Sequence, residues 1–223
     1  MLPVPKYPRT MHHPSSPGLQ NDDRVSEYPD DILGREVIIT EKIDGGNTGL
    51  YNGEVYARST GQPSTAGWFA MVRKHHAWKT LGDLTYVYHG EDIYGQHSIE
   101  YDAIPESETY MLFNIRRISA QPALGWLSWD DVVATADQMN IPTVPVLFRG
   151  VFNTQKELTN WFNDQIGLPS RLGGDREGFV VRAAEFIPED QFSRLVQKYV
   201  RKNHVQTDQH WKMNWQPCKL KKD

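Results

Sequence analysis

The order of apolar and polar positions is typical of β-strands between residues 36 and 59. Three consecutive apolar residues, Val37 to Ile39, lie inside a segment from Glu36 to Thr40 that predicts a buried strand. Two further short runs, residues 49–51 and 54–59, flank the dipeptide Asn52-Gly53. Asparagine followed by glycine between such runs favours a β-hairpin, because both residues adopt positive φ at low cost. The pattern therefore predicts a strand followed by a hairpin.

The remaining periodicity predicts further strands and helices. Strands are expected at residues 84–91, 110–116, 178–182 and 195–200. Helices are expected at residues 66–79, from Ser128 to about Asn140 and from Thr154 onward, with a short helical turn at residues 188–193. Ser128 and Thr154 each have the spacing of a capping box. Because strands and helices are interspersed without regular alternation, we predict an α+β fold of mostly antiparallel sheets with flanking helices.

Composition divides the chain into three parts. Residues 1–35 are rich in Pro, Ser, Asp and His and lack periodicity, which predicts an irregular N-terminal arm packed on the domain. Residues 36–202 carry the periodic segments and form the predicted domain, and residues 203–223 form a short basic C-terminal tail. From Arg194 to Asp223 there are eight Lys or Arg against two Asp, although the whole chain has a net charge of −4. Such a basic end is typical either of a polyphosphate or nucleic-acid contact or of a solvated terminal helix with a charged tail.

Composition also limits the cellular compartments in which we expect the protein. No apolar run approaches the ~18 residues of a membrane-spanning helix. The N-terminus has prolines and basic residues where a secretory signal has an apolar core. Cys218 is the single cysteine, so an intrachain disulfide is excluded and a reducing compartment is favoured. We therefore expect a cytoplasmic protein with no membrane partner.

The segment from Thr40 to Asn47 is the most informative one for chemistry. It places Lys42 at the end of a predicted strand, just before Asp44 and Gly45-Gly46, where a nucleotide can approach the backbone. A lysine amine held out of water near phosphates can act as a covalent nucleophile. The amine must be neutral to attack, so nearby cations or desolvation have to lower its pKa.

Other polar residues stand at strand ends or turns further along the chain, namely Arg58, Glu91, Glu177, Lys198 and Arg201. Carboxylates on neighbouring strands can hold a divalent metal and ribose hydroxyls, while lysine and arginine neutralise charge on phosphate oxygens. Each motif alone is a weak signal, because a Lys-x-Asp-Gly tetrapeptide is usually only a β-turn. Together these residues favour nucleotidyl transfer.

Six segments occur in an order that matches a known family. They are Glu41 to Asn47, Ala57 to Ser59, His89 to Tyr101, Leu112 to Ile115, Glu177 to Arg182 and Lys198 to Arg201. In these motifs the chain resembles the covalent nucleotidyltransferase superfamily and, within it, the ATP-dependent RNA ligase family. The resemblance spans about residues 36–202. It implies the α+β adenylyltransferase domain of DNA and RNA ligases, an ATP-grasp-like nucleotidyltransferase domain. His97-Ser98-Ile99 and Tyr101 resemble an extension of RNA ligases rather than of DNA ligases or capping enzymes.

The chain departs from the family pattern in three places. Asn114 stands where the family often has Asp, and Arg182 stands where a lysine is common. Arginine keeps the charge but not the point-charge geometry of lysine. The part after Lys202 is shorter than the OB-fold or helical domain that many relatives append, so the resemblance leaves substrate docking open.

The resemblance implies a reaction and a role for each site residue. Lys42 would attack the α-phosphate of ATP to form lysyl–AMP, AMP would pass to an RNA 5′-phosphate, and a 3′-hydroxyl would displace it. Catalytic roles fall to Lys42, Asp44 and Lys198, and nucleotide contacts fall to Glu41, Lys42, Asn47, Arg58, Glu91, Phe113, Glu177, Arg182 and Lys198. Among these, Glu91 would hold the ribose hydroxyls, Phe113 would stack on adenine and Glu177 would hold Mg²⁺ or Mn²⁺. RNA contacts would come from Arg58, Arg201 and Lys202.

Alternatives to an RNA ligase remain open at this point. A related nucleotidyltransferase could act on DNA nicks or on a cap-type acceptor, and a silent nucleic-acid-binding protein could retain the fold. The expected partners are nicked or broken RNA ends, with DNA as an alternative acceptor strand. The expected setting is RNA repair in a bacterial or phage-infected cell. Trp215, with Trp211, would either stack on single-stranded nucleic acid or dock the tail on the body.

Overall fold

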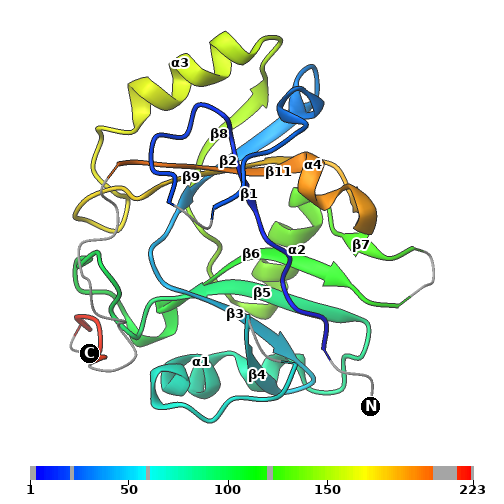
Figure 1. Cartoon of the computed structure of the whole chain (residues 1–223). Coiled ribbons are helices and arrows are strands. Elements are labelled where there is room, and N and C mark those ends of the chain that lie inside the picture. Colours follow the sequence, from blue (N-terminus) through cyan, green and yellow to red (C-terminus); the bar gives the residue numbers. More distant parts are fainter. Residues whose placement is uncertain (1–3, 21–22, 59–60, 120–122, 203–214, 222–223) are drawn as a thin grey trace.

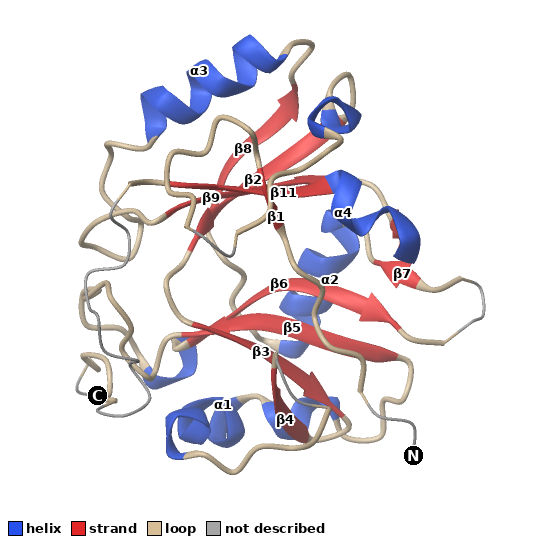
Figure 2. Cartoon of the chain, viewed as in Figure 1, coloured by secondary structure: helices blue, strands red, loops and turns tan. Residues whose placement is uncertain are grey.

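The structure is a computed structural model that describes residues 4–20, 23–58, 61–119, 123–202 and 215–221. Two β-sheets face each other across the described part of the chain, and helices cover their outer sides (Figure 1, Figure 2). No helix among the described residues is long and apolar enough to cross a membrane.

The first sheet has the order β1-β11-β9-β2-β8. Its strands are β1 (Met11–His12), β11 (Val196–Val200), β9 (Gly178–Ala183), β2 (Glu36–Lys42) and β8 (Val146–Val151). The second sheet has the order β10-β7-β6-β5-β3-β4. Its strands are β10 (Ile187–Pro188), β7 (Gly125–Trp126), β6 (Tyr110–Arg117), β5 (Tyr86–Asp92), β3 (Gly46–Tyr51) and β4 (Glu54–Ala57). Every named pair is antiparallel except β1 with β11, which confirms the predicted α+β class with mostly antiparallel sheets.

The helices are short, and one of them, at residues 129–139, packs on β6 within the core cluster that also contains Ile38 of β2. The α-helices are α1 (Ala70–His75), α2 (Trp129–Met139), α3 (Gln155–Gln165) and α4 (Phe192–Leu195). Single 3₁₀ turns occupy Pro29–Ile32, Gly67–Phe69, Ala77–Thr80, Glu106–Glu108 and Glu189–Gln191. Both predicted capping positions are confirmed, because Ser128 accepts a hydrogen bond from the Asp131 N–H and Thr154 accepts one from the Glu157 N–H.

The run Val37 to Ile39 is continuously apolar because β2 is buried on both faces. Ile38 joins the core cluster between the two sheets, with Leu112 of β6. Val37 and Ile39 join the cluster on the opposite face, where Phe162 of α3 covers the sheet. Burial of each such side chain contributes about 1.5–3 kcal/mol, so β2 is fixed firmly up to its last residue, Lys42.

Two expectations about elements were wrong or incomplete. The single helix predicted at residues 66–79 is instead a 3₁₀ turn, the helix α1 and another 3₁₀ turn. The helix ends at His75, and the buried ring of the next residue, His76, hydrogen-bonds the Ser107 carbonyl oxygen and packs against Tyr110. Strand β8 was not predicted, and its alternation is weak because it pairs with β2 alone at the sheet edge.

The N-terminal arm crosses both sheets, as the dark blue trace in Figure 1 shows. Its strand β1 lies parallel to β11 and extends the first sheet. Its Tyr7 is buried between the sheets, in edge contact with Phe113 and Trp126. The described C-terminal residues 215–221 lie against the segment that follows β5. The arm therefore packs on both sheets, and residues 215–221 pack on the loop after β5.

Candidate active site

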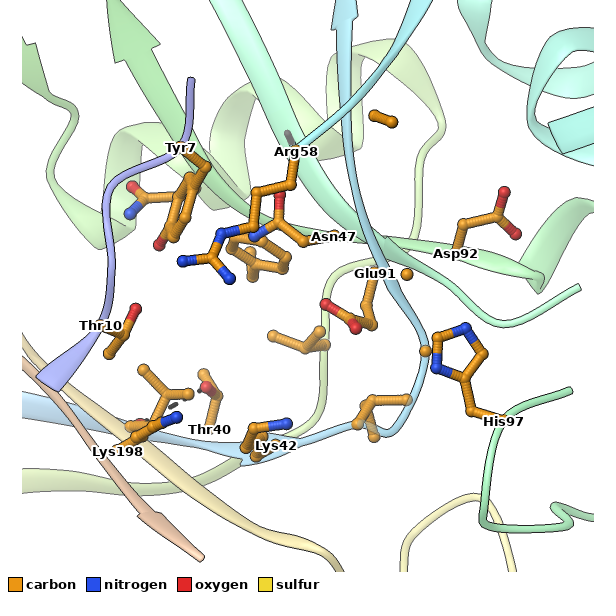
Figure 3. Close-up of a pocket in the computed structure, with 18 of the residues that line it drawn as sticks. Tyr7, Thr10, Thr40, Lys42, Asn47, Arg58, Glu91, Asp92, His97 and Lys198 are labelled. Carbon is orange, nitrogen blue, oxygen red and sulfur yellow. Dashed lines mark hydrogen bonds between the residues drawn. The ribbon is translucent and has the colours of Figure 1, made fainter. Parts of the chain in front are cut away.

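A cavity of about 790 Å³ lies between the two sheets, where the chain leaves β2 and enters β3. Lys42, Thr40 and Lys198 line it from the first sheet, and Asn47, Glu91 and Phe113 line it from the second. Figure 3 shows Lys42 and Lys198 on one side of the open space, with Glu91 and Arg58 opposite. Residues far apart in the sequence thus surround one space that is large enough for a nucleotide.

The amine of Lys42 is held by a buried carboxylate. Lys42 Nζ lies 2.6 Å from both Oε1 and Oε2 of Glu177, which directly precedes β9. Burial lowers the pKa of Lys42, but the carboxylates of Glu177 and Glu91 outweigh it, so the pKa is raised. Burial raises the pKa of Glu177 to about 6, against the opposing effect of the Lys42 charge. While it is paired with Glu177, Lys42 is therefore a protonated ammonium group and not a neutral, nucleophilic amine.

Glu91 is the second carboxylate that acts on Lys42. It stands on β5, opposite Asn47 of β3 in the sheet register. Burial raises the pKa of Glu91 to about 8, and the charge of Glu177 adds to that increase while Lys42 opposes it. The carboxyl group faces the cavity (Figure 3). There it can accept hydrogen bonds from hydroxyl groups and, when protonated, donate one to them.

The turn that follows Lys42 is fixed by the predicted His-Ser-Ile-x-Tyr element. The Asp44 N–H donates a hydrogen bond of 2.7 Å to the Tyr101 hydroxyl, and the Ile99 N–H donates one of 2.8 Å to Asp44 Oδ2. A Cβ at Gly45 would lie 2.7 Å from the Asp92 carbonyl oxygen, so only glycine fits at this position. The Asp44 carboxylate is thus engaged with the loop at residues 97–101 and orients the turn rather than the amine itself.

The wall opposite Lys42 carries the residues predicted for base, ribose and phosphate contacts. Phe113 lines the cavity from β6, in edge contact with Tyr7 of the arm. Asn47 Oδ1 is buried without a hydrogen-bond partner among the described residues. Arg58 follows β4, and its N–H donates to the Asn47 carbonyl oxygen at 3.2 Å. Phe113, Asn47 and Arg58 thus line one cavity, and their predicted contacts with a nucleotide stay predictions.

Arg182 and Asn114 form a buried pair, and they are the two positions where the chain departs from the family pattern. Arg182 Nη1 donates to Asn114 Oδ1 at 2.8 Å, and Nη2 donates to the Leu127 carbonyl oxygen at 2.6 Å. Burial lowers the pKa of Arg182 to about 10. Arg182 on β9 and Asn114 on β6 thus link the two sheets, and the two departures are in direct contact. Arg182 reaches the cavity wall, and its predicted phosphate contact stays a prediction.

Glu41 is the predicted nucleotide-binding residue whose side chain is turned aside. Its carboxylate is 1% exposed, accepts the Arg171 N–H at 3.0 Å and lies 3.8 Å from Arg176 Nε. Neighbouring side chains on a strand point to opposite faces, so Glu41 and Lys42 diverge. A contact from Glu41 to a nucleotide would have to come from its main chain.

The basic residues near the C-terminus are largely paired with acidic ones. Arg194 pairs with Asp31, Lys198 with Asp23, Arg201 with Asp175 and Lys219 with Glu100. Lys202 is exposed. The terminal helix of one sequence interpretation is absent from the described residues, where β11 occupies 196–200. Trp215 packs against Trp68 and Tyr94, whereas Trp211 lies outside the described residues.

The donor set suits a hard divalent cation bound through few protein ligands. Among the described residues no group of three or more His, Cys, Asp or Glu is arranged to hold a metal. Mg²⁺ commonly keeps several waters and uses one or two carboxylates plus substrate phosphates. Glu177 fits that requirement, because both of its carboxylate oxygens contact Lys42 and a cation could take the place of the ammonium group. Glu91 lies close enough to influence the pKa of the same lysine.

Several cavity residues were not identified from the sequence. The arm contributes Tyr7, Arg9, Thr10 and Asp23, and β2 contributes Thr40. The signal for the arm residues is weak, because only pairing with a strand more than 170 residues away brings them to the site. His12 and His13, which lie in this Pro- and Ser-rich segment, are buried because the segment packs against β11.

Comparisons with known proteins agree with this arrangement. A family model described as RNA ligase matches residues 35–200. A mutant Naegleria gruberi RNA ligase with ATP and Mn superimposes with a TM-score of 0.58 at 17% identity, covering 90% of this chain and 57% of that one. An archaeal ATP-dependent RNA ligase superimposes with a TM-score of 0.52 at 15% identity, covering 89% and 48%. No curated protein sequence matches the chain.

These identities establish the fold, a nucleotidyltransferase domain like that of RNA ligases. The chain spans about half to three-fifths of the length of the two structures, so it corresponds to one portion of each.

Proposed function

The chain belongs to the RNA ligase family, and from this we propose that it is an ATP-dependent RNA ligase that joins 3′-hydroxyl and 5′-phosphate ends through lysyl–AMP. The observation that carries the proposal is the Lys42–Glu177 contact in a cavity between two sheets. A strand-end lysine with a buried carboxylate partner and open space beside it suits covalent nucleotidyl transfer.

In the first step the neutral Nζ of Lys42 forms a bond to the α-phosphorus of ATP. The bond from that phosphorus to the bridging oxygen breaks, pyrophosphate leaves, and the lysine proton passes to solvent or to a carboxylate. Asp44 keeps the turn in place through the Ile99 N–H. Lys198 offsets the charge that develops on the phosphate oxygens.

The remaining site residues bind and orient the nucleotide. Phe113 offers a ring for stacking on the base, and Glu91 offers a carboxyl group to the ribose hydroxyls. Arg182 presents a cationic edge to the phosphates from the opposite sheet. Arg58 lies on the same wall as Asn47 and is suited to a phosphate, either of ATP or of an RNA end.

Glu177 would hold Mg²⁺ or Mn²⁺, with Glu91 nearby. A cation bound there would supply positive charge that disfavours the ammonium form of Lys42 and polarises the phosphates. The proposal takes support from solved RNA ligase structures of Naegleria gruberi that contain ATP and Mn. Once Glu177 no longer pairs with Lys42, burial remains as a force that lowers the lysine pKa.

In the second and third steps the AMP on Lys42 is passed to an RNA 5′-phosphate, and a 3′-hydroxyl then displaces AMP to form a phosphodiester. Family membership and the loop from His97 to Tyr101 favour RNA as the acceptor over DNA nicks or a cap. RNA repair inside a cell is the setting that we propose, with magnesium or manganese present.

A sealing assay tests the choice of acceptor. The chain is incubated with ATP, Mg²⁺ or Mn²⁺ and one of three end-labelled substrates, namely nicked duplex RNA, single-stranded RNA or nicked duplex DNA. The proposal expects a longer labelled RNA strand. It also expects the 5′-phosphate to become resistant to phosphatase, because it is now part of a phosphodiester. Sealing of nicked DNA alone would replace RNA with DNA as the acceptor. In a parallel incubation with GTP in place of ATP, transfer of GMP to RNA 5′ ends would indicate a capping-type enzyme.

A further inference from the structure

Lys198, a proposed phosphate-binding residue, is paired with an acidic residue of the N-terminal arm. Asp23 Oδ1 lies 3.2 Å from Lys198 Nζ. The two side chains are 18% and 21% exposed, so the pair is mostly shielded from water. Both residues line the cavity. An ion pair in such a setting is screened less than one on the surface.

The Asp23 carboxylate is itself held from two sides. The Gln20 N–H donates to Asp23 Oδ2 at 3.0 Å, and His12 Nε2 lies 3.0 Å from Asp23 Oδ1. His12 is 1% exposed. Burial raises the pKa of the Asp23 carboxyl, but the Gln20 N–H and Lys198 outweigh it, so the pKa is lowered. The carboxylate is therefore charged and fixed in direction.

The contacts return to the strand that carries Lys198. His12 Nδ1 lies 2.9 Å from Ser16 Oγ, and Ser16 Oγ accepts the N–H of Val200 at 2.9 Å. Val200 and Lys198 both belong to β11. The His13 N–H donates to the Lys198 carbonyl oxygen at 2.8 Å. These contacts form a closed path between the arm and β11. It runs from Lys198 through Asp23, His12 and Ser16 and returns to β11 at Val200.

Lys198 is subject to the charges of the Lys42–Glu177 pair as well as to that of Asp23. Burial lowers the pKa of Lys198 and the charge of Lys42 adds to that decrease, whereas Asp23 and, more weakly, Glu177 oppose it. A lysine side chain is a flexible stem with a point charge. Without Asp23, the Lys198 ammonium would be drawn toward Glu177 and would compete there with Lys42.

We propose that Asp23 is a positioning residue of this enzyme: it holds the Lys198 ammonium at the phosphate side of the cavity and away from Glu177, and His12 with Ser16 holds Asp23 in turn. The inference rests on the proposed function, since it assigns the arm a role in ATP binding and lysine adenylylation. It also gives residues 11–20 and 23–26 of the arm a role beyond covering the sheet.

The first test measures lysyl–AMP formation against ATP concentration for the full chain and for Asp23→Asn, Asp23→Glu and Glu27→Gln. Asp23→Asn should lower kcat/KM for ATP about tenfold, the order expected when one ionic hydrogen bond is lost. Asp23→Glu should recover most of that loss, because it restores the charge. Glu27 is an exposed acidic residue of the same arm, so Glu27→Gln should match the wild type.

A double-mutant cycle separates positioning from simple support of the fold. Binding of α,β-methylene-ATP, which cannot transfer AMP, is measured by calorimetry for the wild type, Asp23→Asn, Lys198→Gln and the double variant. If Asp23 acts through Lys198, Asp23→Asn should weaken binding in the wild type and have no further effect after Lys198→Gln.

Two results would overturn the inference. They are multiplicative effects in the cycle and an unchanged kcat/KM for ATP in Asp23→Asn. A wild-type chain that forms lysyl–AMP but is insensitive to Asp23 would contradict this inference alone. A wild-type chain that neither binds the analogue nor forms lysyl–AMP would contradict the proposed function as well.

Discussion

Lys42 Nζ lies 2.6 Å from each carboxylate oxygen of Glu177, and this contact joins the end of β2 to the start of β9. The contact keeps Lys42 protonated, because the carboxylate charges outweigh the effect of burial on the lysine pKa. It also brings the proposed metal ligand, which directly precedes β9, next to the proposed nucleophile at the end of the neighbouring strand β2. In the mechanism that we propose, activation of Lys42 requires Glu177 to release the lysine ammonium group.

Replacement of Glu177 by Gln should separate activity from stability. Lysyl–AMP formation should fall by about 100-fold or more, the scale seen when a group that stabilises developing charge is removed. The thermal unfolding midpoint should change little, since the amide keeps the shape and one hydrogen-bond acceptor for Lys42. Single-turnover labelling with α-³²P-ATP and a thermal melt measure the two effects. Wild-type labelling by Glu177→Gln would refute the role of the carboxylate.

The Tyr101 hydroxyl accepts the Asp44 N–H and links the RNA-ligase-like loop to the Lys42 turn. Tyr101→Phe leaves that N–H without its partner, a loss of roughly 1–3 kcal/mol in a buried setting. We expect about a tenfold slower lysyl–AMP formation with little change in KM for ATP. Steady-state labelling across ATP concentrations checks this. A raised KM with an unchanged kcat would place Tyr101 in nucleotide binding instead.

Asp92 makes stability depend on pH. Burial raises its pKa from 3.8 to about 8, against the opposing effects of the Tyr94 N–H and Arg73. The folded state holds the proton more tightly, so its stabilising effect is complete below pH 3.8 and is lost as pH rises through about 8. Asp92→Asn should therefore raise the unfolding midpoint by about 3–10 °C at pH 8 and have little effect at pH 4.

The control for Asp92 is Asp137→Asn, at an exposed position of α2. Both variants and the wild type are melted between pH 4 and pH 8. A constant difference between Asp92→Asn and the wild type at every pH would exclude a titration of Asp92 as the cause.

The C-terminal residues 215–221 hold the loop that follows β5. The Cys218 N–H donates to the Tyr94 carbonyl oxygen at 2.8 Å, and the Gln96 N–H donates to the Gln216 carbonyl oxygen at 2.8 Å. Trp215 packs at 6.3 Å between ring centroids against Trp68, which lines the cavity. Trp215→Ala should therefore slow lysyl–AMP formation and RNA sealing by the same factor, about 3- to 10-fold, since an aromatic pair contributes about 0.5–1.5 kcal/mol beyond its buried area.

Lys219→Gln is the matched control, because it removes an exposed ion pair with Glu100 and such pairs contribute little. A selective loss of sealing in Trp215→Ala would instead favour the nucleic-acid contact that the basic composition suggested.

The sequence predicted the parts of the fold that depend on local pattern. The run Val37 to Ile39 gave the central strand, Asn52-Gly53 gave the hairpin, and Ser128 gave the start of α2, because each depends on neighbours within a few residues. The order of motifs then brought together residues such as Lys42 and Glu177, which no local rule connects.

What the sequence did not reveal depends on distant contacts. Asp23 reaches Lys198 across 175 positions, and the two-residue strand β1 has no pattern of its own until β11 pairs with it. Strand β8 was missed for a similar reason, since its exposed edge imposes little alternation. The break at His76 follows from a hydrogen bond to Ser107 that lies outside the helix.

Mass spectrometry of the chain after incubation with ATP and Mg²⁺ or Mn²⁺ tests the central claim most directly. The account predicts one AMP per chain, attached at Lys42 in the peptide map, sensitive to acid and absent from Lys42→Ala. Addition of pyrophosphate should remove the AMP and regenerate ATP. Failure to find AMP on the wild-type chain with either metal, or AMP on a residue other than Lys42, would contradict the account.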